Sequence, residues 1–217
     1  ACNRVQGPYL KDWVGVVALH CRDDFEDIFN ILKEIMTVIL KAVKHLHHNG
    51  LIYLNLTDEN IRVYRKPDET LVVAISGFMF TVCKNEDNEL KKQPVTKYKW
   101  NEFSAPELDV WPESYAIDQK NETKTFKPGY SMDLQMRADV YSLGKIFMKS
   151  CANLGLDLGN DHLLASANIS KKMKQGLNEL LNFTTADNVC ERWSIDRCLA
   201  SSFIGDENAV CMISSIE

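Results

Sequence analysis

The chain has 217 residues, of which 45% are hydrophobic and 25% are charged, and its formal net charge is −5. This length suffices for one large or two small globular domains with a substantial core. The 25 Lys and Arg residues are scattered along the chain, which argues against a nucleic-acid-binding surface, and no apolar run approaches the roughly 18 residues of a membrane span.

Cysteines and glycosylation sequons bear on the cellular compartment. The seven cysteines form no C-x-x-C pair, so neither a zinc site nor a redox motif is indicated. Three of them are close enough in sequence to bridge, namely Cys190, Cys198 and Cys211, and buried free thiols are an equal alternative. Sequons of the N-x-[ST] type begin at Asn55, Asn121, Asn168 and Asn182. On these features alone a secreted protein and a cytoplasmic protein are equally open.

The first half of the chain predicts a strand followed by helices. Residues 12–21, "DWVGVVALHC", form a short Val-rich apolar run that predicts a buried strand. Residues 22–30 are acidic and predict a short helix. Residues 31–50 carry apolar side chains at steps of three and four, which predicts a long amphipathic helix. The helix should stop at Asn49–Gly50, because both residues tolerate the left-handed conformation of a helix end.

The middle of the chain predicts a β-hairpin and two loops. Residues 61–65 and 71–75 are β-type runs on either side of a Pro-Asp turn. Long polar stretches at 84–104 and 109–135 predict loops. Loops of this length in a compact domain are usually functional or mobile.

The second half of the chain predicts helices. Residues 136–154 predict a buried helix and residues 170–182 an amphipathic one. Residues 194–204, "SIDRCLASSFI", predict a last short helix with a Ser N-cap. The fold class predicted from this order is α+β, mainly α, with a short β-hairpin.

An ordered series of motifs resembles the C-terminal lobe of a protein kinase. The segment "LHHNGLIYLNLTDENI" stands where that family has L-H-x-x-x-I-I-H-R-D-L-K-P-E-N-I, and "LVVAISGFMF" stands where a strand leads into D-F-G. "FSAPEL" contains the A-P-E motif, "ADVYSLGKIF" matches the D-V-W-S-L-G helix, and "CERWSIDRCLA" matches the late R-P-x-x-x-x-x-L segment. The series is in the family's order from about residue 12 to residue 203, nearly the whole chain.

The resemblance implies a domain organisation. Residues 1–24 would be the end of the small N-terminal lobe and a hinge-like segment, and residues 25–217 would be the C-lobe, with its long loops at 84–104 and 109–135. The family's Gly-rich loop and strand-3 Lys have no counterpart before residue 12. We therefore expect the small lobe to be absent from this chain or supplied by another.

The catalytic loop departs from the family pattern at each reactive position. Kinase chemistry needs a carboxylate to orient the substrate hydroxyl, and Asn55 stands at that position. Tyr53 and Leu54 replace the preceding His and Arg, and Thr57 replaces the catalytic-loop Lys.

The metal-binding positions are also incomplete. Ser76, Gly77 and Phe78 stand where the family has D-F-G, so the carboxylate that holds magnesium is missing. Asn60 matches the second metal-ligand position, and it could bind a ligand or hydrogen-bond within its own loop. A single amide is a poor Mg²⁺ site, because at least one carboxylate is usual. We expect no cofactor, with ATP and Mg²⁺ as the disfavoured alternative.

The structural positions of the family are retained. Glu107 and Arg192 match a buried ion pair between the A-P-E segment and the late helix, and Asp139 matches the residue that braces the catalytic-loop backbone. The resemblance therefore implies a retained fold with degenerate chemistry, that is, a pseudokinase.

A narrower resemblance is to the secreted rhoptry pseudokinases of apicomplexan parasites. It is carried by "ISGF", by "YLNLTDEN" and by the long interval from Glu107 to Asp139, 139 − 107 = 32 positions. That family adds disulfides to its C-lobe and acts on host or vacuolar targets. The implied location is a parasite secretory organelle, vacuole or cyst wall.

The predicted function is a catalytically inactive kinase-like scaffold or regulator with protein partners, without nucleic acid and without a membrane span. One alternative is a residual nucleotide-binding protein or atypical phosphotransferase that needs an N-lobe from another chain. Another is an unrelated all-helical interaction domain. The neighbouring His47 and His48 suggest a metal pair, but adjacent helical residues point about 100° apart, so a solvated helix end is favoured.

Overall fold

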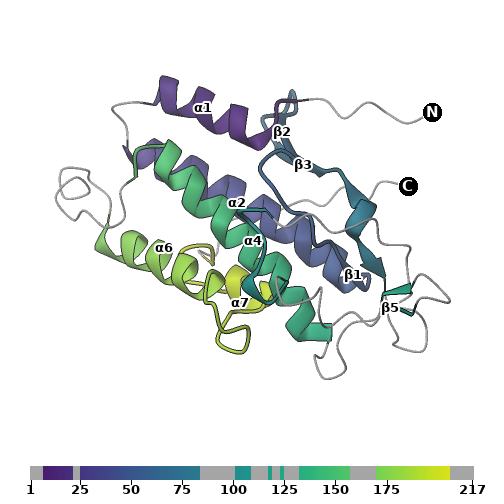
Figure 1. Cartoon of the computed structure of the whole chain (residues 1–217). Helices are drawn as coiled ribbons and strands as arrows, with labels where there is room; N and C mark the ends of the chain where they lie inside the picture. Colours follow the sequence, from purple (N-terminus) through teal and green to yellow (C-terminus); the bar gives the residue numbers. More distant parts are fainter. Residues whose placement is uncertain are drawn as a thin grey trace.

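The fold is mixed α+β and mainly helical, with short antiparallel strand pairs. The structure is a computed structural model, and it describes residues 7–21, 25–83, 101–108, 117–118, 123–124, 132–156 and 170–205. Figure 1 shows α2, α4 and α6 side by side, with α1 above α2 and α4 and running in about the same direction, and the β2–β3 hairpin at the end of α1.

The helix α2 (Phe25–His48) is the central wall of the core. Its apolar side chains recur at steps of three and four and are almost completely buried, among them Ile28, Leu32, Ile35, Ile39 and Val43. It lies against β1, β3, α4 and α7. The predicted stop is confirmed, because Gly50 has a φ of 70° and its N–H donates to the carbonyl of His47 at 3.0 Å. The short acidic helix expected before it is wrong as a separate element, since one helix begins at Phe25.

The predicted buried strand at residues 12–21 is wrong, because the structure has the helix α1 (Leu10–His20) there. Leu10, Val14 and Val17 are spaced at helical intervals and fill one buried face. The Val-rich composition favoured a strand, but packing of this face against α4 and β2 determines the outcome.

The predicted hairpin is confirmed. β2 (Ile61–Arg65) pairs antiparallel with β3 (Leu71–Ile75) in a continuous register from Ile61 opposite Ile75 to Arg65 opposite Leu71. β3 lies on α2. Arg65 ties the hairpin to that helix by donating to both carboxylate oxygens of Glu34, at 3.2 and 2.7 Å.

Two further strand pairs are very short. β1 (Leu51–Ile52) pairs antiparallel with β4 (Val82–Cys83), and β5 (Ile117–Asp118) pairs antiparallel with β6 (Thr123–Lys124). Three-residue 3-10 turns lie at Phe78–Phe80 and Pro106–Leu108.

The two predicted loops are only partly described. Of the loop expected at 84–104, residues 84–100 lie outside the described part, and residues 101–104 form a turn. The loop expected at 109–135 is wrong at its end, because α4 begins at Met132, and it contains the β5–β6 pair. The first turn of α4 has little apolar periodicity, so the sequence placed the start of the helix too late.

The predicted helices in the second half of the chain are present. They are α4 (Met132–Asn153), α6 (Lys171–Thr184) and α7 (Ile195–Leu199). The Ser194 hydroxyl accepts from the N–H of Arg197 at 3.3 Å, as expected of an N-cap. The helices α4 and α6 approach closely at Gly144, where a Cβ would lie 2.5 Å from Oγ1 of Thr184.

Some of the cysteines and sequon asparagines lie in the described part of the chain. Cys190 and Cys198 are both free thiols, as are Cys21 and Cys151, while Cys211 lies outside the described residues. Burial raises the pKa of Cys198 to about 12. Of the sequon asparagines, Asn182 is exposed on α6 and Asn55 is half-buried, and the other two lie outside the described residues.

Candidate functional site

The loop formed by residues 53–60, hereafter the 53–60 loop, follows β1 and is held by a carboxylate of α4. Asp139 is completely buried, and it accepts hydrogen bonds from the backbone N–H groups of Tyr53 at 2.8 Å and Leu54 at 2.7 Å. Leu54 has a φ of 61°, a left-handed conformation that a leucine rarely adopts. The charged acceptor supplies strong hydrogen bonds that hold this strained turn in place.

His47 also contacts the Asp139 carboxylate that holds the loop. The sequence did not identify it as a site residue. Its Nε2 lies 2.9 Å from Oδ2 of Asp139, and its side chain is only 5% exposed. Because the carboxylate can only accept, the imidazole N–H is the donor. The expectation of a solvated helix end is therefore wrong for His47, whereas His48 is exposed. The signal in the sequence was its place on the buried face of α2, four residues after Val43.

The Ser76–Phe78 segment closes over the loop through Tyr53. The Tyr53 hydroxyl donates to the carbonyl of Ser76, and its ring meets that of Phe78 edge-on, with centroids 5.1 Å apart. Burial, and then the Asp139 carboxylate, raise the pKa of Tyr53 above its ordinary value. Tyr53 therefore acts as a neutral hydrogen-bond donor that joins the two segments.

A cluster of amides joins the 53–60 loop to the Ser76–Phe78 segment; we call it the amide cluster (Asn55, Asn60, Ser76 and Gly77). Nδ2 of Asn60 donates to the carbonyl of Asn55 at 2.8 Å, and Nδ2 of Asn55 donates to the carbonyl of Gly77 at 3.1 Å. The carbonyl of Asn60 accepts from the Ser76 N–H at 2.9 Å. Gly77 has a φ of 90°, and a Cβ there would lie 3.1 Å from Oδ1 of Asn60.

The polar groups of the amide cluster are unsuitable as ligands for Mg²⁺. They are neutral, and the amide nitrogens and the Ser76 hydroxyl are turned toward backbone carbonyls. In the described part of the chain, no three His, Cys, Asp or Glu side chains gather in a way that could hold a metal ion. Mg²⁺ sites normally contain at least one carboxylate.

The two acidic residues of the 53–60 loop are already neutralised by lysines. Asp58 is buried and lies 3.0 Å from Nζ of Lys149 on α4, while the exposed Glu59 lies 2.8 Å from Nζ of Lys11. Lys149 also lies 2.9 Å from Glu102. The hydrogen bond with Glu102 first, and the contact with Asp58, raise the pKa of Lys149 against the opposing effect of burial. The sequence analysis missed this cluster, because the motif that places Asp139 beside the loop gives no partner for Lys149 ten residues further along α4.

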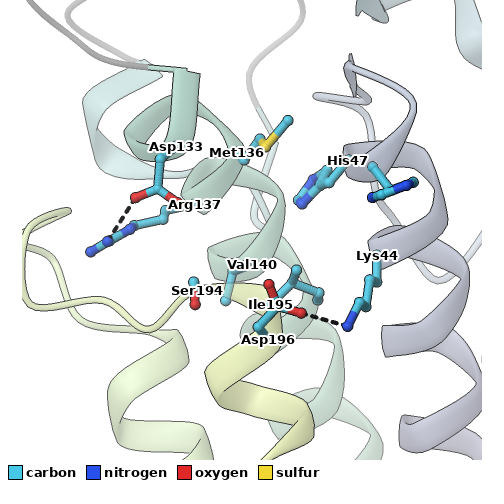
Figure 2. A pocket seen from close by; sticks show the side chains of 10 residues that line it. Lys44, His47, Asp133, Met136, Arg137, Val140, Ser194, Ile195 and Asp196 are labelled. Carbon is cyan, nitrogen blue, oxygen red and sulfur yellow. Dashed lines mark hydrogen bonds and ion pairs between the residues drawn. The ribbon is translucent and has the colours of Figure 1, made fainter.

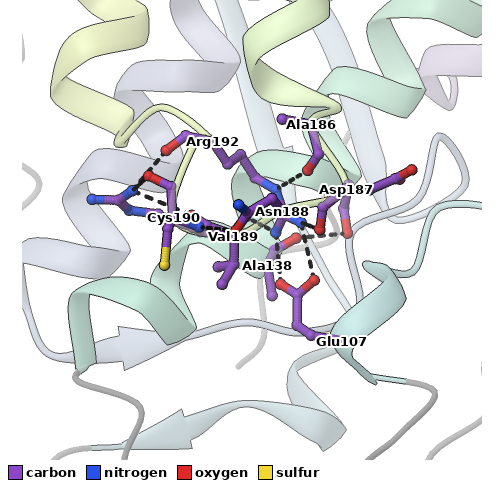
Figure 3. Close-up of polar contacts among 10 residues, drawn as sticks. Glu107, Ala138, Ala186, Asp187, Asn188, Val189, Cys190 and Arg192 are labelled. Atoms are coloured by element: carbon purple, nitrogen blue, oxygen red, sulfur yellow. Dashed lines mark hydrogen bonds and ion pairs between the residues drawn. The ribbon is translucent and has the colours of Figure 1, made fainter.

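Glu107 and Arg192 form a bidentate ion pair (Figure 3). Nη1 of Arg192 lies 2.6 Å from Oε1 of Glu107, and Nη2 lies 3.0 Å from Oε2. The guanidinium is completely buried; its Nε donates to the carbonyl of Ala186 and its Nη1 to that of Arg137, both at 3.0 Å. This cation therefore joins three segments that are far apart in the sequence.

Arg137 on α4 is a second arginine of this region that sequence reasoning missed. Its Nη1 donates to the carbonyls of Val189 and Cys190, both at 3.2 Å, and to that of Arg192 at 2.8 Å. The two arginines thus donate hydrogen bonds to backbone carbonyls along the segment between α6 and α7.

A pocket of about 170 Å³ lies where the end of α2, the start of α4 and α7 meet (Figure 2). Its charged walls are already paired, Lys44 with Asp196 at 2.6 Å and Arg137 with Asp133 at 2.8 Å. Its lining includes no residue of the 53–60 loop or of the Ser76–Phe78 segment. It borders the site through His47, which contacts Asp139, and through Arg137, which binds the segment between α6 and α7.

No protein-family profile and no curated protein matches this chain. Within the described ranges, none of the helices has the length and apolar content needed to cross a bilayer.

Proposed function

We propose that this chain is the helical lobe of a pseudokinase, a kinase-like fold without phosphoryl-transfer chemistry that acts as a protein-interaction scaffold. The observation that carries the proposal is the amide cluster. At the two positions where the resemblance calls for carboxylates, Asn55 donates to the carbonyl of Gly77 and Ser76 is bound to the carbonyl of Asn60. Neither group can accept a substrate proton or neutralise a metal ion.

The contacts of Asp139 and the ion pair of Glu107 and Arg192 support the same proposal. In the kinase family, the residue matched by Asp139 holds the catalytic-loop backbone, and the pair matched by Glu107 and Arg192 anchors the A-P-E segment. In this chain Asp139 accepts two backbone N–H groups of the 53–60 loop, and Arg192 binds Glu107 bidentately. A fold that keeps these contacts while its carboxylates are replaced is suited to binding rather than to catalysis.

The helix α1 offers apolar surface to a protein partner. Val16 is 52% exposed and Leu19 is 63% exposed, one helical turn apart, while the opposite face of α1 is buried. A helix that is apolar on both faces is usually covered on both. The rhoptry-type resemblance, which rests on the loop sequences alone, would make that partner a host or vacuolar protein.

A thermal-shift titration with ATP, with and without Mg²⁺, tests the loss of chemistry. A ligand at a hundredfold excess over its dissociation constant stabilises a protein by about 2.7 kcal/mol, which is a readily visible shift. We expect no shift in either titration, because the amide cluster has no free carboxylate. An active protein kinase in the same buffers serves as the positive control.

A phosphoryl-transfer assay on generic protein substrates completes the test. We expect no transfer by the natural chain, and none by Asn55→Asp, since that change leaves Ser76 in place of the second carboxylate. Phosphoryl transfer that is present in the natural chain and lost in Asn60→Ala would refute the proposal. A Mg²⁺-dependent shift without transfer would instead support the residual nucleotide-binding alternative.

A further inference from the structure

The two outer edges of the β2–β3 hairpin differ. The outer edge of β2 is covered by the segment before α1. There the N–H of Val63 donates to the carbonyl of Pro8 at 3.0 Å, and Arg62 donates to the carbonyl of Gly7 at 2.7 Å. The Arg62 guanidinium also lies 4.0 Å from the centre of the Tyr9 ring. This edge is therefore closed by the chain itself.

The hydrogen-bond pattern shows which groups of β3 point outward. At one end of the hairpin, the N–H of Ser76 donates to the carbonyl of Asn60, and at the other end the N–H of Lys66 donates to that of Thr70. In an antiparallel pair the bonded residues alternate, so the even-numbered residues of β3 face β2. The N–H and C=O groups that point away belong to Leu71, Val73 and Ile75. Within the described part of the chain, none of these groups has a backbone hydrogen-bond partner.

The outer edge of β3 lacks the features that normally prevent edge pairing. Natural edge strands carry charges, prolines or bulges that discourage the addition of another strand. β3 reads "LVVAI", with no charge and no proline, and its register with β2 runs through five consecutive pairs without a bulge. It is an uncharged, regular strand whose outer edge has no backbone hydrogen-bond partner among the described residues.

We propose that this edge pairs with the same edge of a second copy of the chain. An antiparallel pair centred on Val73 places Val73 opposite Val73 of the second copy, and Leu71 opposite Ile75. All of these residues belong to the outward set, so every outward N–H and C=O group finds a partner. In this twofold arrangement each strand makes the same contacts as the other, as an isologous interface requires.

The side chains suit the same register. On the face of the hairpin turned away from α2, Val72 falls opposite Ala74 of the second copy, which is an apolar pair. Beyond the strand, Thr70 falls opposite Ser76 and Glu69 opposite Gly77, so no like charges meet. The product is a four-stranded antiparallel sheet whose two outer edges are those already closed by residues 7–9. The proposal is independent of the pseudokinase assignment, because it rests on the backbone geometry and the side chains of the hairpin.

Amide hydrogen exchange of the full chain at low and high protein concentration is the first test. We expect exchange of the Val73 and Ile75 amides to slow by about tenfold or more as concentration rises. The amides of Val72 and Ala74 are internal controls, because they face β2 and should be protected at every concentration. Sedimentation measured over the same range should show the monomer mass rising toward twice its value.

A matched pair of variants locates the interface. In the proposed register, Val72→Lys with Ala74→Lys brings two lysine pairs together across the twofold axis, whereas Val72→Lys with Ala74→Glu brings opposite charges together. We expect the first variant to remain monomeric and the second to dimerise. Circular dichroism and the melting temperature at low concentration verify that both variants are folded.

Three results would overturn the proposal. The first is a natural chain that stays monomeric at all concentrations. The second is a dimer in which the Val73 and Ile75 amides gain no protection. The third is a pair of folded charge variants that dimerise equally. The exchange experiment decides the question on the natural chain even if a variant fails to fold.

Discussion

The ion pair of Glu107 and Arg192 and the amide cluster are both networks of polar groups. They differ in charge and in the segments of the chain that their hydrogen bonds connect. The ion pair contains a completely buried guanidinium that binds a carboxylate and backbone carbonyls from distant segments. The amide cluster contains only neutral groups, each making one or two hydrogen bonds within two neighbouring segments. The difference indicates that a buried charge joins distant segments of the fold, whereas the contacts of the amide cluster are made by neutral groups. Three substitutions measure this contrast as free energies of unfolding.

The largest effect is expected for Arg192→Ala. The change leaves the Glu107 carboxylate without its partner in a mostly buried place and removes the donors to two carbonyls. We expect a loss of about 3–5 kcal/mol in the free energy of unfolding, measured by urea titration. The matched control is Arg197→Ala, because this exposed arginine lies over the rings of Trp193 and Phe183 and should cost no more than about 1 kcal/mol. Equal losses in the two variants would show that burial of the ion pair carries no special weight.

An intermediate effect is expected for Asp139→Asn. The amide keeps one acceptor oxygen but presents its NH₂ to donors, so at least one of the N–H groups of His47, Tyr53 and Leu54 loses its partner. We expect a loss of about 1–3 kcal/mol and faster hydrogen exchange at the amide of Tyr53 or Leu54, whichever faces the new NH₂ group. Asp133→Asn is the control, because its surface pair with Arg137 should contribute about 0.5 kcal/mol. Unchanged exchange at both the Tyr53 and the Leu54 amide would exclude Asp139 as the residue that holds the 53–60 loop.

The smallest effect is expected for Asn60→Ala. This change removes the hydrogen bond from Nδ2 to the carbonyl of Asn55, while the backbone bond from Ser76 remains. We expect a loss of about 1 kcal/mol in the same urea titration. The exposed Asn182 of α6 has no side-chain bond in the described part of the chain, so Asn182→Ala should be neutral or slightly stabilising. A loss as large as that of Arg192→Ala would mean that the amide cluster stabilises the fold as much as the ion pair does.

The parts of the fold that the sequence predicted are those with a strong local pattern. The heptad-like spacing of α2 and its Asn49–Gly50 end, the hairpin around the Pro-Asp turn, and the Ser194 cap all follow from neighbouring residues. The helix α1 was missed because its Val-rich run satisfies strand and helix rules alike. Only the packing of Leu10, Val14 and Val17 against other elements distinguishes the two.

The candidate site was predictable where a motif marks a position and not where a contact spans the chain. The motif series pointed to Asn55, Asn60 and Asp139 as neighbours of one loop. The ion pair of Asp58 with Lys149 and the hydrogen bond of His47 to Asp139 connect residues about ninety positions apart. No local pattern encodes such a pair, because the partners meet only after α2 and α4 have packed.

The bond from Tyr53 to Asp139 also imposes an order on synthesis. The two residues are 86 positions apart, so the left-handed turn at Leu54 has no carboxylate to hold it until α4 has been made. At the usual pace of translation this delay is roughly 4–17 s. The hairpin that follows, with its short-range contacts, can form within microseconds. During that interval a finished hairpin would lie beside a loop that Asp139 does not yet hold, and its β3 edge, which has no backbone partner among the described residues, could pair with another nascent chain on the same messenger.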